Sequence, residues 1–152
     1  MKRIGLSGGI ACGKSSVARI LRDKGIPVVD ADQVARDIVE PGSAALLELV
    51  QEFGAAILDE NGALKRKTLG SIVMNDEKKR ARLNQITHPK IRASIFSTLQ
   101  TWYKQGHKAG VVEAALMVET KSHALYDALI IVTCTPKTQL ERLMAREGFD
   151  QE

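Results

Sequence analysis

Short apolar runs alternate with longer amphipathic stretches along this chain. Four runs have the length of a β-strand, namely Lys2–Ser7, Ile26–Asp30, Val111–Ala114 and Ala128–Thr133. The last two are apolar without alternation, as in strands that are buried on both faces of a sheet. Amphipathic stretches follow the strands, the first over Lys14–Lys24. This order of elements predicts an α/β fold with a parallel sheet and flanking helices.

The segment between the second and third predicted strands is long and almost wholly helical. Its helices are expected from Asp30 to about Glu40, over Ser43–Phe53, Lys67–Asn75 and Glu77–Thr87, and from His88 to about Gln105. We expect residues 43–106 to form a helical substrate lobe within one domain that spans residues 1–152. Asp150-Gln151-Glu152 has the pattern of a helix start, so we expect the last strand of the sheet to lie beyond Glu152.

Composition narrows the class of protein without identifying its chemistry. The chain has 152 residues, of which 44 % are hydrophobic and 26 % charged, and this is ordinary for one soluble domain. It has no apolar run of the roughly 18 residues that a membrane helix needs, and two distant cysteines are typical of a reducing cytosol. A net charge of +4 fits an anionic small molecule as well as nucleic acid, but six aromatic residues give little support to a base-stacking surface. We therefore expect a cytoplasmic protein, a monomer or weak oligomer, with no membrane or nucleic-acid partner.

A phosphate-binding motif follows the first predicted strand. Residues 8–15 read Gly-Gly-Ile-Ala-Cys-Gly-Lys-Ser and match G-x-x-x-x-G-K-[ST], the P-loop pattern, without a mismatch. In such loops successive backbone N–H groups point at phosphate oxygens, the lysine places a charge on the β- and γ-phosphates, and the serine hydroxyl binds Mg²⁺. The motif predicts an ATP-binding set of Gly8, Gly9, Ala11, Cys12, Gly13, Lys14, Ser15 and Ser16. Cys12 is either a redox-sensitive position or, as we favour, a small residue whose backbone N–H matters.

Two aspartates end the second predicted strand, where ligands bind in open α/β sheets. Asp30 and Gln33 form a capping-box pattern, which directs the Asp30 carboxylate at backbone amides of the following helix. Asp32 has no capping duty, and its carboxylate can accept a proton from a substrate hydroxyl as a general base. The alternative for Asp32 is an acid favoured only by the helix dipole. Arg36 lies four residues on and can pair with Asp32 or hold a substrate phosphate.

Further charged residues follow the third and fourth predicted strands. Arg142 and Arg146 are one helical turn apart, and such like charges repel unless an anion lies between them. This spacing suits a lid that closes on phosphates, and the alternative is a solvated face neutralised by neighbouring glutamates. Glu113 ends the third strand, where an acid can orient water on Mg²⁺ or, alternatively, satisfy nearby amides.

Several segments together resemble the dephospho-coenzyme A kinases. The resemblance lies in Ile4–Ser15, Val29–Gly42, Phe53-Gly54, Gly62–Arg66, Leu83-Asn84, Ile86–Pro89 and Thr138–Arg142. These segments keep the family's register from residue 3 to the end of the chain. The resemblance implies a P-loop kinase-type fold, with ATP and Mg²⁺ as cofactors. It also implies transfer of the γ-phosphate of ATP to the ribose 3′-hydroxyl of dephospho-coenzyme A, the last step of coenzyme A synthesis.

The resemblance also suggests roles for individual residues. It implies that Asp32 is the base and that Arg142 stabilises the transferring phosphate, and Lys14 of the motif completes the predicted catalytic set. Arg146 joins the ATP site, and the predicted substrate-binding residues are Ser7, Arg36, Arg66 and His88. For the basic stretch around Arg66, a solvated turn is the alternative. Two other functions stay open, a P-loop kinase for a nucleotide or another small alcohol, and a nucleotide-binding module without catalysis.

Overall fold

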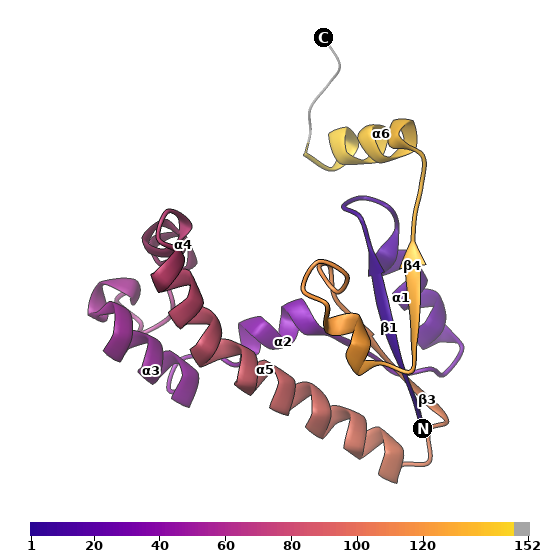
Figure 1. The fold of residues 1–152 in the computed structure, drawn as a ribbon, viewed down its shortest axis with the longest axis horizontal. Coiled ribbons are helices and arrows are strands. Elements are labelled where there is room, and N and C mark those ends of the chain that lie inside the picture. The colour runs from indigo at the N-terminus through magenta and orange to yellow at the C-terminus, as the bar shows by residue number, and fades with distance from the viewer. Residues whose placement is uncertain (148–152) are drawn as a thin grey trace. The chain divides into compact units, whose positions relative to one another are not determined.

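The structure is a computed structural model that describes residues 1–147. Its chain forms two compact units (Figure 1). The first unit consists of Met1–Asp32 together with the chain from Thr98 onward, and it contains the β-sheet. The second unit is Gln33–Ser97 and is helical.

The sheet of the first unit has four strands in the described part of the chain. They are β1 (Lys2–Gly8), β2 (Val28–Asp30), β3 (Ala109–Glu113) and β4 (Ala128–Val132). All neighbouring pairs are parallel, and the order is β2-β3-β1-β4. The strand that leads into the phosphate loop is therefore an inner strand, between β3 and β4. The predicted α/β fold with a parallel sheet is confirmed.

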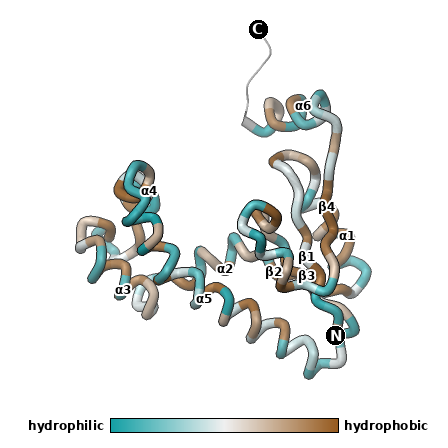
Figure 2. Tube along the Cα trace, in the orientation of Figure 1, coloured by the Kyte–Doolittle hydropathy of each residue, from teal (hydrophilic) through white to brown (hydrophobic). Residues whose placement is uncertain are grey.

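The core of the first unit forms where helix α1 (Lys14–Asp23) packs on the sheet. Leu6, Ala18 and Val111 have no exposed surface, and partly buried apolar side chains surround them. β3 is buried from Gly110 to Glu113, which explains why its sequence is apolar without alternation. Figure 2 shows the hydrophobic residues gathered where the strands run together.

Four helices supply most of the second unit. They are the larger part of α2 (Ala31–Asp37), α3 (Ala44–Phe53), α4 (Arg66–Met74) and the first part of α5 (Glu77–Lys104), with a short 3-10 helix η1 (Ala55–Ile57). Leu49 and Ile57 are fully buried at the centre of an apolar cluster that also includes Val39, Leu69 and Ile86. The Ser43 hydroxyl caps α3 by accepting the N–H of Leu46 at 3.2 Å. This unit therefore owes its fold to apolar helix faces.

One boundary expected from the sequence is wrong. His88-Pro89 was expected to separate two helices, but α5 is continuous from Glu77 to Lys104 with Pro89 inside it. A proline there removes one backbone hydrogen bond. Near the proline, Thr87 Oγ1 donates to Leu83 O at 2.9 Å and Lys90 Nζ donates to Ile86 O at 3.3 Å. Packing of the buried Ile86 in the core favours the helix through the proline.

The C-terminal part of the first unit contains a short 3-10 helix η2 (Ser122–Leu125) and helix α6 (Pro136–Glu147). Thr135 caps α6 by accepting the N–H of Thr138 at 3.2 Å. The helix start expected at Asp150 lies outside the described residues. Within residues 1–147, no helix has the length and apolar character needed to cross a membrane.

Candidate active site

The phosphate loop connects the end of β1 to the start of α1. Ala11 and Gly13 have positive φ values of 59° and 101°, so the chain turns twice in the left-handed region before Lys14. Gly8 faces another constraint, because a Cβ there would lie 2.6 Å from the carbonyl oxygen of Val132 in the neighbouring strand. Glycine is thus required at position 8 for close strand packing and at position 13 for the turn.

Backbone hydrogen bonds fix the shape of this loop. The Cys12 N–H donates to Gly9 O at 3.2 Å, and the Ser16 N–H donates to Gly13 O at 3.1 Å. The N–H groups of Lys14 and Ser15 belong to the first turn of α1, where no carbonyl of the same helix can accept them. With the positive end of the helix dipole, these groups create a site suited to a phosphate.

A buried acid holds the lysine of the loop. Lys14 Nζ lies 3.4 Å from Glu113 Oε1, and only 17 % and 6 % of their side chains are exposed. Arg22 Nη2 lies 3.9 Å from the other carboxylate oxygen of Glu113, Oε2. Glu113 ends β3 beside Leu6 of β1, so the sheet itself places the carboxylate next to the loop. The Lys14 charge is therefore held in place before any phosphate arrives.

Helix α6 contacts the same loop through two polar side chains. Gln139 Nε2 donates to Ile10 O at 2.7 Å, and Arg142 Nη1 donates to Cys12 O at 3.3 Å. Their three-residue spacing puts both on one face of α6. Arg142 therefore contacts the phosphate loop, and its role toward phosphate stays a prediction; the exposed Arg146 follows one turn later. Sequence reasoning missed Gln139, although its spacing from Arg142 was a usable signal.

The two aspartates after β2 differ in their contacts. Asp30 Oδ1 accepts the Asp32 N–H at 2.8 Å, which confirms that Asp30 caps the start of α2. Asp30 is also the β2 residue in register with Glu113. Asp32 occupies the second position of α2, and its side chain is exposed. Ser7, from the predicted substrate set, is buried, and its hydroxyl donates to Ala115 O at 3.2 Å.

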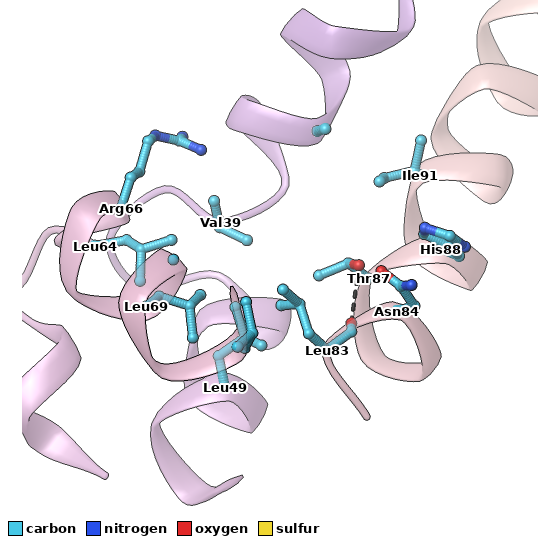
Figure 3. A pocket seen from close by; sticks show the side chains of 13 residues that line it. Val39, Leu49, Leu64, Arg66, Leu69, Leu83, Asn84, Thr87, His88 and Ile91 are labelled. Atoms are coloured by element: carbon cyan, nitrogen blue, oxygen red, sulfur yellow. Dashed lines mark hydrogen bonds between the residues drawn. The ribbon is translucent and has the colours of Figure 1, made fainter. Parts of the chain in front are cut away.

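The second unit contains a mostly apolar pocket of about 340 Å³ (Figure 3). Arg66 lies on one side of it, and Asn84 and His88 lie on the other, with leucine side chains between. Arg66 Nη2 also donates to the backbone oxygen of Arg36 at 3.4 Å. The structure thus brings together Arg66 and His88, two of the predicted substrate residues.

The pocket contains polar groups that the site prediction omitted. Asn84 and Thr87 line it beside His88. Leu83-Asn84 was among the segments of the family resemblance, so a signal for Asn84 existed in the sequence. Burial, and after it the charge of Arg92, lower the pKa of His88 below its ordinary value, so that its ring is neutral at pH 7.

The first unit has side chains that suit a magnesium ion with only one or two protein ligands. Residues 1–147 contain no group of three or more His, Cys, Asp or Glu side chains able to hold a metal. Mg²⁺ in phosphate-binding sites keeps waters and phosphate oxygens as ligands and takes only one or two from the protein. The exposed hydroxyl of Ser15, in the first turn of α1, suits such a role.

Comparison with known proteins identifies the family. The family model for dephospho-CoA kinase matches residues 2–152. The chain belongs to the dephospho-CoA kinase family. A relative named dephospho-CoA kinase from Bacillus cereus is 44 % identical over 149 residues, which cover 98 % of this chain and 74 % of the relative. Another from Bdellovibrio bacteriovorus is 43 % identical over 152 residues, which cover 100 % of this chain and 76 % of the relative.

Solved structures share this fold. The crystal structure of TT1252 from Thermus thermophilus has a TM-score of 0.84 at 28 % identity, and the match covers 98 % of this chain and 74 % of that one. A dephospho-CoA kinase from Campylobacter jejuni has a TM-score of 0.66 at 22 % identity, with 95 % of each chain covered. The second similarity is of the fold alone.

Proposed function

We propose that this kinase-family chain transfers the γ-phosphate of ATP to the ribose 3′-hydroxyl of dephospho-CoA. The observation that carries the proposal is the phosphate loop with its ion pair between Lys14 and Glu113, in a chain of the dephospho-CoA kinase family. The loop accounts for the donor, and the family accounts for the acceptor. The chemistry is phosphoryl transfer, in which the protein mainly positions groups and stabilises charge.

ATP binds with its phosphates on the N–H groups at the start of α1. Lys14 exchanges part of its contact with Glu113 for the β- and γ-phosphate oxygens, and because Arg22 also faces Glu113, the buried carboxylate keeps a partner. Arg142 turns from Cys12 O to the transferring group, and Arg146 adds charge from the next turn of α6. These cations stabilise the negative charge of the transition state.

Asp32 removes the proton from the acceptor. Its carboxylate is exposed at the start of α2, while Asp30 is occupied with the backbone of that helix. As the ribose 3′-oxygen bonds to the γ-phosphorus, the bond to the β-γ bridging oxygen breaks and ADP leaves. The hydroxyl proton passes to Asp32.

The pocket of the second unit binds the acceptor. Its leucine-rich wall suits the apolar parts of dephospho-CoA, whereas Arg66 suits a phosphate and Asn84 and the neutral His88 suit hydrogen bonds. Arg36, on whose backbone Arg66 rests, joins this site. Ser7 supports the first unit through its bond to Ala115 O, and its predicted role toward substrate stays a prediction.

Mg²⁺ bound with ATP would take the Ser15 hydroxyl as a protein ligand and would neutralise charge on the phosphates. Glu113 would act on the ion only through water, since Lys14 and Arg22 already face its carboxylate. We further propose that the protein works in the cytoplasm as a monomer or weak oligomer.

An acceptor screen tests the proposed function. The protein is incubated with MgATP and, separately, with dephospho-CoA, nucleoside monophosphates and shikimate, and phosphorylated products are measured by mass spectrometry. Phosphorylation of dephospho-CoA alone is the expected result. Equal rates on nucleotides would favour a different P-loop kinase, and ATP binding without turnover on any acceptor would favour a non-catalytic module.

A further inference from the structure

The chain has two cysteines, and the fold brings them into contact. Cys134 Sγ donates to Cys12 Sγ at 3.3 Å, although the residues are 122 positions apart in sequence. Cys12 belongs to the phosphate loop and is 8 % exposed. Cys134 is half-buried and lies between β4 and the N-cap of α6.

The sheet makes this contact a consequence of the fold. β1 and β4 are parallel neighbours, and their last paired residues are Gly8 and Val132. The two strands leave the sheet side by side, with Cys12 in the loop after one and Cys134 directly after the other.

We propose that Cys12 and Cys134 form a reversible dithiol–disulfide site whose oxidation disables the phosphate loop. The oxidant is a low-molecular-weight disulfide. The Cys134 thiolate attacks it, forms a mixed disulfide and releases one small thiol. The Cys12 thiolate then attacks Cys134 Sγ and releases the second small thiol. The protein loses two protons and two electrons, and the small disulfide is reduced to two thiols.

Cys134 is the residue that reacts first. It is the more exposed of the two, whereas Cys12 is buried in the loop. The hydrogen bond to Cys12 and then burial raise the pKa of Cys134, and the charge of Arg142 opposes this in part. Little Cys134 thiolate is therefore present at neutral pH, so its attack on the small disulfide is slow.

Formation of the bond draws Cys12 and Cys134 closer together. The sulfur atoms must approach from 3.3 Å to the bond length of about 2.05 Å. Cys12 Sγ is closely surrounded, because even a Cβ built on Gly9 would lie 3.2 Å from it. The Cys12 carbonyl oxygen also accepts a hydrogen bond from Arg142 Nη1 at 3.3 Å. Pulling Cys12 toward β4 therefore displaces the backbone N–H groups that face phosphate and weakens ATP binding.

The first test follows the bond itself. The full chain is equilibrated in buffers of reduced and oxidised glutathione, and free thiols and intact mass are measured. We expect two thiols to disappear together, with a mass decrease of about 2 Da that a dithiol reductant reverses. Cys134→Ser and Cys12→Ser are matched controls that leave one thiol each. Two persisting thiols, or disulfides formed only between chains or with glutathione, would overturn the proposal.

The second test follows the loop. ATP affinity is measured for the reduced and oxidised protein, and amide hydrogen exchange of residues 9–16 gives a readout that needs no nucleotide. We expect ATP to bind at least about tenfold more weakly after oxidation and, by reciprocity, saturating ATP to disfavour the disulfide by the same factor. Cys134→Ser should keep the affinity of the reduced protein in both buffers.

The two tests separate this proposal from the proposed function, on which only the ATP readout rests. A disulfide that leaves both ATP affinity and hydrogen exchange unchanged would overturn the control of the loop. Absence of ATP binding in the reduced protein would instead contradict the proposed function, and the thiol, mass and exchange readouts would still decide the redox site.

Discussion

The two units of this protein solve different physical problems. The sheet unit fixes a charged group, because the buried Glu113 carboxylate pairs with Lys14 beside a loop with two residues in the left-handed region. The helical unit is held together by its apolar core, which includes the fully buried Leu49 and Ile57, and its pocket has few polar groups. The phosphate loop is thus a contiguous motif, whereas the proposed acceptor pocket is assembled from residues of several helices.

The largest expected effect comes from removing the charge in the sheet unit. Lys14→Met should reduce turnover by on the order of 10³–10⁵-fold, because a cation on the transferring phosphoryl group is lost. Steady-state kinetics with saturating ATP measure this effect. Near-normal turnover by the folded variant would remove the loop from the mechanism.

Stability separates the structural role of Lys14 from its chemical role. The variant leaves Glu113 buried with Arg22 as its remaining close cation, so the free energy of unfolding should fall by up to about 3 kcal/mol. The double variant Lys14→Met/Glu113→Gln should recover stability without recovering activity. Recovery of activity as well would show that Lys14 acts only through folding.

The next effect compares two neighbouring acids. Asp32→Asn should lower turnover by about 10²–10⁴-fold while ATP still binds, because the proton acceptor is lost. Asp30→Asn is the matched control and should mainly change thermal stability, and only modestly, since asparagine is also a good cap. If Asp30→Asn abolishes activity at unchanged stability and Asp32→Asn does not, the two roles are reversed.

A core substitution tests the helical unit in turn. Leu49→Ala should lower the free energy of unfolding by about 2–5 kcal/mol, because it opens a cavity at a fully buried position. ATP affinity, measured by calorimetry below the unfolding transition, should stay unchanged, since the loop lies in the other unit. Loss of ATP binding at full folding would contradict the division of labour.

The smallest effect concerns backbone conformation in the loop. Ala11 has φ 59°, so Ala11→Gly should relieve left-handed strain and raise the free energy of unfolding by about 0.5 kcal/mol after the entropy of glycine is subtracted. The same substitution at Ala81, exposed in helix α5, should lower it by about 1 kcal/mol. Chemical denaturation of both variants gives the comparison, and equal signs would contradict it.

The sequence was most informative where neighbouring residues alone determine the local structure. The strand, loop and helix around Lys14 follow from a contiguous motif, and the capping role of Asp30 follows from its position. The four parallel strands could also be predicted from their apolar runs. The expected burial on both faces is confirmed for β3 and wrong for β4, which is the last strand in the order of the described sheet and has Ile131 53 % exposed. The continuity of α5 through Pro89 could not, since burial of Ile86 outweighs the local preference for a break.

The missed site residues are those that the fold brings from far away. Gln139 contacts Ile10 across 129 positions, and its three-residue spacing from Arg142 indicates a shared helix face but not this partner. The pocket likewise joins Arg66 to Asn84 and His88 from two different helices. Family resemblance located part of this pocket, whereas periodicity indicated only that helices would be present.

The most direct test of the account measures the two substrates separately in two variants. Calorimetry with ATP and with dephospho-CoA is performed on the parent protein, on Gln139→Leu and on Arg66→Met. Gln139→Leu removes the donor to Ile10 O and should weaken ATP by about tenfold, with dephospho-CoA unaffected. Arg66→Met removes the pocket's cation and should weaken dephospho-CoA by about tenfold, with ATP unaffected. If Arg66→Met weakens ATP as much as dephospho-CoA, or Gln139→Leu weakens both equally, the assignment of one substrate to each unit is wrong.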